Sequence, residues 1–252
     1  MTRLLKHGLL ACLIALTASM AGCVKFKQTT TVMPDGSGKF DLLFGISDQM
    51  LQMAQQQGED PFGDMEPTEL GKESKGIVAF TKPVKEKKGG YTYMSLSAYF
   101  EDINEVQLGS PDDEEKPAKF SYKRDGKSAT LTVENAMIFS IISEHEPMAP
   151  EEKAFARQML AGMSFIEAYV LPGEFEDIKG VDANDNTATI ELGAQDMLDG
   201  TGPIKDLKDA EQLDFKITEV KEDADAAKAF NAELEAAKKE WEEIKKEAEA
   251  AE

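Results

Sequence analysis

The sequence has little positive charge, few cysteines and histidines, and no long hydrophobic run. Its 252 residues contain 28 Lys and Arg against 48 Asp and Glu, a formal charge of −20. A chain this acidic is poorly suited to neutralising a phosphate backbone, so we expect no nucleic-acid partner. No uninterrupted apolar run reaches the roughly 18 residues that span a bilayer, which argues against a polytopic membrane protein.

Residues and motifs for catalysis are also scarce. Beyond residues 1–22 the chain has one histidine, His145, and no second one to complete a zinc site. No serine stands in a Gly-x-Ser-x-Gly elbow, and no two of the many carboxylates are marked as a pair. Residues 182–186 resemble the start of a calcium loop but lack its glycine, so a polar turn is favoured. We therefore expect no enzymatic activity, no metal site and no cofactor.

The clearest signal that is present is an export signal. Two cations precede an uncharged run over residues 8–21, which is typical of a signal peptide. The run ends in a sequence that resembles the lipobox of bacterial lipoproteins, Met20-Ala21-Gly22-Cys23. Cys12 lies within the signal, so Cys23 has no partner for a disulfide after cleavage. These features predict removal of residues 1–22 and lipid attachment, with palmitate among the acyl chains, at Cys23.

Lipid attachment would place the mature chain in the cell envelope, on the extracytoplasmic side. Val24 follows Cys23 in place of the aspartate that retains many lipoproteins at the inner membrane, so the outer membrane is favoured if the organism has two. The signal holds two cations and no acid, which leaves 26 cations against 48 acids, a charge of −22. Such a charge predicts solubility and mild repulsion from anionic headgroups.

The mature chain mixes strands and helices, and we expect an α+β fold: a largely antiparallel sheet with two short packing helices and a long C-terminal amphipathic helix. Asp-Gly turns predict two hairpins. Short helices are expected to begin at Ser47 and Pro150, and the acidic segment 58–75 is expected to be a solvated, disordered loop. The expected domains are a signal peptide (1–22), an extracytoplasmic domain (23–220) and a charged helix (221–252). The expected strands are 24–33, 39–44, 77–81, 91–100, 165–170, 187–192, 213–220 and a hairpin over 119–133.

Two sets of apolar residues are candidates for binding. Methionines on the two short helices could form a face for apolar ligands, although such residues are more often core filler: Met50, Met53, Met159 and Met163. The C-terminal helix carries a heptad seam over 227–251. That seam could dock on the chain's own domain, or form a coiled coil with a second copy or a protein partner through Phe230, Leu234, Trp241 and Ile244.

Three phrases resemble the LppM-type family of bacterial lipoproteins, whose members are mostly uncharacterised. They are Val32-Met33-Pro34-Asp35-Gly36-Ser37-Gly38, Phe100-Glu101-Asp102-Ile103-Asn104-Glu105-Val106 and Tyr169-Val170-Leu171-Pro172-Gly173-Glu174. The resemblance implies an anchored α+β domain outside the cytoplasm, in contact with lipids or glycolipids, and carries no catalytic residues. We therefore expect a lipid-anchored, non-enzymatic protein with a binding or scaffolding role at the membrane surface. The alternative is a lipid- or glycolipid-binding module with an apolar pocket between sheet and helices.

Overall fold

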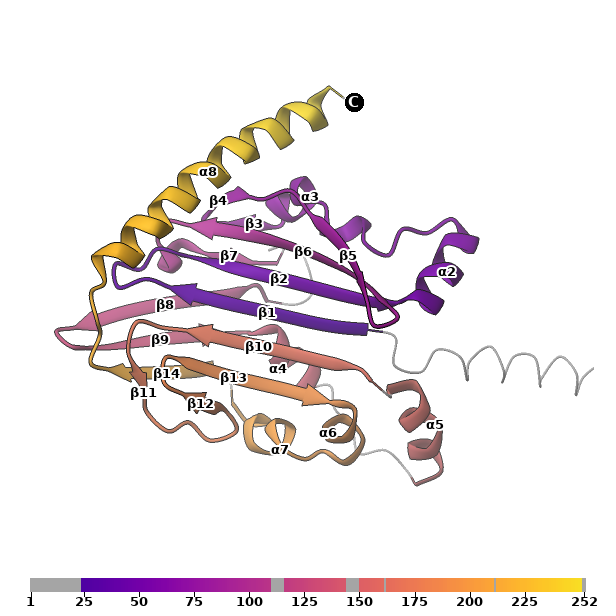
Figure 1. Ribbon diagram of the computed structural model, residues 1–252. Coiled ribbons are helices and arrows are strands. Elements are labelled where there is room, and N and C mark those ends of the chain that lie inside the picture. The colour runs from indigo at the N-terminus through magenta and orange to yellow at the C-terminus, as the bar shows by residue number, and fades with distance from the viewer. Residues whose placement is uncertain (1–23, 110–115, 144–149, 161, 211, 251–252) are drawn as a thin grey trace, which may run out of the picture.

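The computed structural model describes residues 24–109, 116–143, 150–160, 162–210 and 212–250, which form two β-sheets with helices around them (Figure 1). In sheet A the strand order is β12-β13-β10-β1-β2-β6-β4, and β5 also pairs with β6. In sheet B the order is β11-β14-β9-β8-β7-β3. The strands of sheet A are β1 (Val24–Val32), β2 (Gly38–Ser47), β4 (Ile77–Phe80), β5 (Val84–Lys88), β6 (Tyr91–Phe100), β10 (Ser164–Val170), β12 (Asp182–Asn184) and β13 (Thr187–Gly193). Those of sheet B are β3 (Ser74–Lys75), β7 (Gln107–Leu108), β8 (Ala118–Asp125), β9 (Ser128–Glu134), β11 (Glu174–Phe175) and β14 (Gln212–Thr218).

The α+β class is confirmed, and the strand pairs in the described residues are antiparallel with one exception. Strands β1 and β2 form one predicted hairpin and β8 and β9 form the other. The exception is the parallel pair of β1 with β10, in register from Lys25↔Ser164 to Thr31↔Val170. This pair joins the beginning of the domain to a segment far along the chain, so sheet A cannot be completed from local hairpins alone.

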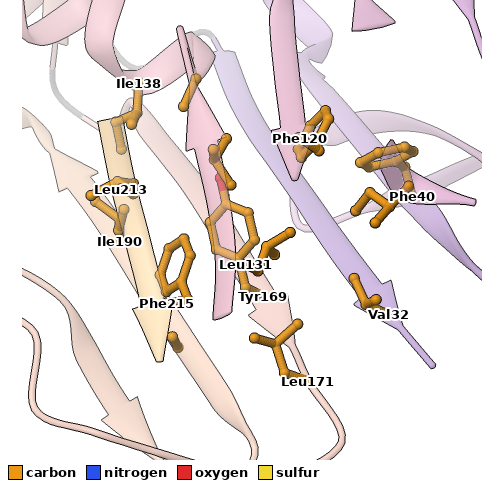
Figure 2. Packing of buried hydrophobic residues seen from close by; sticks show 14 of the residues in the cluster. Val32, Phe40, Phe120, Leu131, Ile138, Tyr169, Leu171, Ile190, Leu213 and Phe215 are labelled. Carbon is orange, nitrogen blue, oxygen red and sulfur yellow. The ribbon is translucent and has the colours of Figure 1, made fainter. Parts of the chain in front are cut away.

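The main hydrophobic core lies between the two sheets. Alternate residues of each strand point into it, so that in β9 Ala129, Leu131 and Val133 are buried while their neighbours are not. Aromatic rings bridge the sheets: Tyr169 of sheet A lies 4.3 Å from Phe215 of sheet B, measured between ring centroids. Figure 2 shows this packing, in which side chains from both sheets meet in one layer.

Short helices lie at the sheet ends. The two predicted helices are present: Ser47 caps the first by accepting a hydrogen bond from the backbone N–H of Met50, and Gly58 ends it with φ 79°. The second begins at Pro150, as expected. The helices are α2 (Asp48–Gln57), α3 (Pro67–Lys72), α4 (Met137–Ser143), α5 (Pro150–Leu160), α6 (Ala194–Asp199), α7 (Pro203–Leu207) and α8 (Ala224–Glu249), with 3₁₀ turns at Gly63–Met65 and Ile103–Glu105.

The prediction that segment 58–75 is a disordered loop is wrong. Its acids lie between apolar residues that pack on the domain, and it folds into a 3₁₀ turn, α3 and β3. Phe62 is 2% exposed and meets Phe44 edge-on, with 5.9 Å between ring centroids. Pro67 is buried and opens α3. Burial of a few apolar side chains therefore outweighs the high charge of the segment.

The long helix α8 lies across the outer face of sheet A, against β4 and, through Tyr99, against β6 (Figure 1). Phe230, Leu234 and Ala237 are buried against Tyr99 and Ala79. The sequence left open whether the seam docks on the chain's own domain or on a second copy or partner. These three residues dock on the chain's own domain. Further along, Trp241 packs on Phe80 with 5.3 Å between ring centroids, and Ile244 is half-buried. In the described part of the chain, no helix is long and apolar enough to cross a membrane.

Candidate functional site

Two adjoining grooves lie where α8 begins, beside the turn between β1 and β2. We call them the paired grooves. The first has a volume of about 410 Å³ and the second about 400 Å³, and both are lined by Met33, Pro34 and Asp223. The first is completed by Thr31, Val32, Val170, Leu171, Pro172, Gly173, Glu174, Asp185, Asn186, Lys221 and Ala226. The second is completed by Asp35, Ser37, Arg124, Glu222, Ala224, Ala227, Phe230 and Asn231.

The turn that separates the grooves is held by its own polar groups. Asp35 accepts hydrogen bonds from the backbone N–H and the hydroxyl of Ser37, at 3.0 and 2.6 Å. Gly36 adopts φ 88°, which few other residues tolerate, and its carbonyl accepts a bond from the backbone N–H of Ile103 at 2.9 Å. The turn is therefore fixed both internally and to the 3₁₀ turn Ile103–Glu105 that follows β6.

The opposite wall of the first groove follows β10. The backbone N–H of Leu171 donates to the backbone carbonyl of Asn186 at 3.0 Å, and the carbonyl of Pro172 accepts from the backbone N–H of Lys221 at 2.8 Å. A Cβ atom at Gly173 would lie 2.5 Å from the carbonyl oxygen of Thr218, so the backbone here passes too close for a side chain. These contacts tie the wall to the segment that leads into α8.

Asp223 closes the N-terminus of α8. One of its carboxylate oxygens accepts from the N–H groups of Asp225 and Ala226, both at 3.0 Å, so these helix-end donors are already used. Arg124 pairs with Glu222 at 2.9 Å at the rim of the second groove. Acids outnumber bases among the lining residues, with five against two: Asp35, Glu174, Asp185, Glu222 and Asp223 against Arg124 and Lys221. The grooves thus suit an apolar ligand whose polar end is neutral or cationic, rather than an anion.

The three phrases that carry the family resemblance meet at this end of the molecule. The phrase Val32–Gly38 forms the turn, and the phrase Tyr169–Glu174 forms the opposite wall of the first groove. The phrase Phe100–Val106 supports the turn from behind through Ile103. Segments that are distant in sequence therefore build one structure at the start of α8. The family resemblance is carried by these segments, but the sequence did not predict that they come together at the paired grooves.

A third pocket, between sheet A and α3, is much smaller. It measures about 130 Å³ and is lined mostly by apolar residues, among them Phe40, Leu70 and Phe80, with Gln28 and Glu73 beside them. Ligand pockets for small molecules generally occupy about 300–1,000 Å³. Each of the paired grooves is therefore better sized for a ligand than this third pocket.

The predicted methionine face is divided between separate helices. Helix α2 contacts β2 and β6, where Met50 joins a small cluster with Ile46 and Met94, and Met53 is half-buried. Helix α5 contacts α6 instead, and Met163 is half-buried just before β10. The side chain of Met159 lies outside the described residues. Met50, Met53 and Met163 are not among the residues that line the paired grooves.

Other residues singled out from the sequence have varied positions. Cys23 and His145 lie outside the described residues. Segment 182–186, expected to be a polar turn, comprises β12 and the two-residue turn that leads to β13, and the turn residues Asp185 and Asn186 line the first groove. Among the residues that the structure describes, no group of three or more His, Cys, Asp and Glu could hold a metal ion.

Glu167 is a buried carboxyl group that sequence reasoning missed. It is 3% exposed on the inner face of β10 and accepts hydrogen bonds from the backbone N–H of Ile138 at 2.9 Å and the hydroxyl of Tyr169 at 2.8 Å. Burial raises the pKa of Glu167 above its usual value, although both donors oppose the rise. These hydrogen bonds join the first turn of α4 to sheet A, so Glu167 has a structural role. An acid in the inward row of the predicted strand 165–170 is the signal that could have found it.

Comparison with known proteins gives one similar structure. No family model matches the chain, and no curated protein matches it. The solution NMR structure of the folded domain of LppM from Mycobacterium tuberculosis is similar, with a TM-score of 0.35 and 10% sequence identity. The match covers 81% of this chain and 94% of that domain. It is a weak likeness to a domain of the kind that the three phrases resemble.

Proposed function

We propose that the protein is a lipid-anchored, non-enzymatic lipoprotein of the cell envelope that binds an apolar ligand in the paired grooves. The observation that carries the binding role is the size and construction of these grooves. Their combined space lies within the range of small-molecule sites, and hydrogen bonds fix their walls before any ligand arrives. Pre-formed walls favour binding because little conformational entropy is lost.

The anchor is argued from Cys23 and from the strand that follows it. Strand β1 begins at Val24, one residue after Cys23, so an acylated cysteine would connect to the sheet with no linker. Strand β1 ends at Val32, which lines the first groove. Nine residues of extended strand span about 30 Å. The grooves would then open about 30 Å from the bilayer, towards the aqueous side.

The ligand that best fits this arrangement is a lipid or other molecule with an apolar chain and without a net negative head. The floor is formed by side chains such as Val32, Met33 and Leu171, whereas the rim is acidic. Because the grooves would lie away from the anchoring bilayer, such a ligand would have to leave a membrane to reach them. This makes lipid or glycolipid carriage the form of binding that we favour.

A groove-filling variant tests the binding role. Ala226 lies in the first groove, and Ala226→Phe should block it, whereas Ala236→Phe places the same ring on an exposed position of α8. Residues 24–252 contain all of the described core and can be purified without the acyl chains. We expect a pyrene-labelled neutral lipid to bind the parent chain and Ala236→Phe but not Ala226→Phe. Absence of binding to the parent chain, together with lipid-free organic extracts in mass spectrometry, would contradict a lipid-binding role.

Labelling in cells tests the anchor separately. Changing Cys23 to alanine should abolish palmitate labelling and leave an unprocessed precursor. The matched control is Cys12→Ala, which lies inside the expected signal and should be labelled as in the parent. Persistence of the label in Cys23→Ala would show that Cys23 is not the attachment site.

A second candidate function is recruitment of a partner through the end of α8. The last two turns of the helix, beyond Trp241, contribute no fully buried residue, and Ile244 and Ala248 remain half-exposed. These residues continue the heptad seam beyond the part that docks on the domain. Sedimentation of residues 24–252 beside Ile244→Glu would detect self-association. Equal monomer masses for both proteins, at concentrations well above micromolar, would argue against a second copy as the partner.

A further inference from the structure

The charge of the mature chain is unevenly distributed, and one end of sheet A is basic. Segments 24–28 and 82–93 together contain six lysines and one acid, Glu86, in a chain whose acids far outnumber its bases. The first segment is the start of β1 and the second includes β5, the turn and the start of β6. All five residues of β5 are exposed.

Strand register brings these two segments to the same end of the sheet. Lys25 pairs with Gly45 of β2, Gly45 pairs with Tyr93 of β6, and Tyr93 pairs with Glu86 of β5. Two residues nearer the end, Lys88 of β5 pairs with Tyr91. Since neighbouring strands lie about 4.8 Å apart, the lysines of β5 lie within roughly 15 Å of the start of β1.

Two tyrosines of this end, Tyr91 and Tyr93, lie on the same face of β6 as Tyr99, which is the outer face of the sheet. The ammonium group of Lys25 lies 4.5 Å from the ring centroid of Tyr91. A Cβ atom at Gly45 would lie 2.6 Å from the ring of Tyr93, so the ring occupies the space that glycine leaves. Tyrosine beside lysine is a combination found where proteins meet the membrane–water interface. The lysines of β5 project from both faces of this exposed edge strand, and the ammonium group of Lys85 lies 5.1 Å from the ring centroid of Phe62. We call Lys25, Lys85, Lys87, Lys88, Tyr91 and Tyr93 the basic hairpin patch.

We propose that the basic hairpin patch contacts the anionic phospholipid headgroups of the membrane that holds the acyl chains of Cys23. The inference deepens the proposed anchor and rests on it. Cys23 directly precedes β1, so acyl chains in the bilayer hold the start of β1 at the headgroups. The patch then lies at headgroup level, where its charge is opposite to that of the lipid.

The contact fixes how the domain stands on the membrane. An acyl anchor alone allows the domain to tilt about Cys23, and the acidic remainder of the chain is repelled by anionic lipid. With the lysines of β5 on the surface, the strands of sheet A point away from the bilayer. The paired grooves are then held at the far end of β1, open to the aqueous phase.

Lysines on an exposed edge strand also discourage pairing with other sheets, so the experiment must separate that role from membrane contact. The acylated protein is reconstituted in vesicles with a fluorescent label on Val84→Cys, a position of β5 that is 62% exposed. Quenching by headgroup spin-labelled lipid reports contact. We expect strong quenching in vesicles that contain phosphatidylglycerol, weak quenching in phosphatidylcholine alone, and loss of the difference at high salt.

Charge-removing variants give the decisive comparison. Lys85→Gln, Lys87→Gln and Lys88→Gln together should abolish the phosphatidylglycerol-dependent quenching. They should also lower partitioning of unacylated residues 24–252 onto these vesicles on the order of a hundred-fold. Lys119→Gln, Lys123→Gln and Lys216→Gln remove the same charge from sheet B and should change neither result. Equal quenching in both triple variants, or no effect of lipid charge on the parent, would overturn the proposal.

Palmitate labelling in cells tests the acyl anchor independently of the lysines. Loss of labelling with the lysine effect intact would reject the anchor and keep the electrostatic contact. Labelling that persists without any effect of the β5 lysines would keep the acyl anchor and reject the electrostatic contact.

Discussion

The two ends of sheet A are built differently. At the groove end, the turn after β1 is hydrogen-bonded internally and to Ile103, and α8 buries Phe230 and Leu234 on the sheet. At the opposite end, where β1 begins, α2 has no fully buried residue and all of β5 is exposed. The first end is held by packing and backbone hydrogen bonds, whereas the second presents charge to its surroundings.

This difference matches what each end is proposed to do. A binding groove gains from walls that are fixed in advance, since ordering them on binding would cost free energy. Contact with a bilayer surface needs charge and reach but no single side-chain arrangement. The comparison predicts that matched substitutions at the two ends have unequal effects on stability.

The largest expected difference is between Phe230→Ala and Met50→Ala. Phe230 is 7% exposed and packs against Tyr99, so its truncation should lower the free energy of unfolding by about 3 kcal/mol or more. Met50 is only half-buried on α2, and its truncation should cost about 1 kcal/mol. Urea unfolding of residues 24–252 measures both. Equal losses would show that the two ends are packed alike.

Two glycines sharpen the comparison without removing any side chain. A Cβ atom at Gly38 would lie 2.0 Å from the carbonyl oxygen of Thr31, so Gly38→Ala must displace the β1–β2 pairing at a cost of about 3 kcal/mol. Gly89, in the turn before β6, has nothing within 4 Å of its added Cβ but adopts φ 61°. Gly89→Ala should therefore cost only about 1 kcal/mol, from backbone strain. Thermal unfolding of the two variants side by side distinguishes a steric clash from simple strain.

Local patterns in the sequence predicted much of the fold. Alternation and Asp-Gly turns located both long hairpins, and Ser47 and Pro150 marked real helix starts. The parallel pairing of β1 with β10 could not be predicted, because it depends on contacts between distant segments and leaves no turn between them. The ordered segment 58–75 was missed because its charge is conspicuous, whereas the apolar anchors Phe62 and Pro67 are isolated.

The candidate site was less predictable than the fold. The phrases that line the paired grooves are visible in the sequence, but only the folded sheets bring Met33 beside Leu171 and the start of α8. The seam of α8 was correctly located, and its partner could not be chosen from periodicity alone. The start of β1 and segment 82–93 likewise give a basic surface only after strand pairing places them at one end.

A buried carboxyl group in the interior makes the free energy of unfolding depend on pH. The pKa of Glu167 is raised in the folded protein, so its contribution to stability is greatest below about pH 4.5 and is lost as the pH rises through the raised value. Glu167→Gln keeps one carbonyl oxygen, which can accept from the N–H of Ile138, while its amide N–H can donate to the hydroxyl oxygen of Tyr169; it should remove this dependence. Glu167→Ala leaves both donors unsatisfied and should cost about 2 kcal/mol. Unfolding free energies across pH 4–8 that are parallel for the parent and Glu167→Gln would contradict the raised pKa.

The smallest expected effect concerns the ion pairs that flank α8. Lys39 lies 3.1 Å from Glu233, but the Glu233 side chain is 53% exposed, so the pair should contribute only about 0.5 kcal/mol. Burial lowers the pKa of Lys39, but Asp41 and Glu233 raise it by more, so the net pKa is above the usual 10.5. The small contribution of the pair to stability is therefore lost only as the pH rises above 10.5. A double-mutant cycle with Lys39→Met and Glu233→Gln at low and high salt measures the coupling. A coupling as large as the loss in Phe230→Ala would mean that charge, rather than apolar burial, holds α8 on sheet A. That result would remove the contrast between a packed groove end and a charged anchor end.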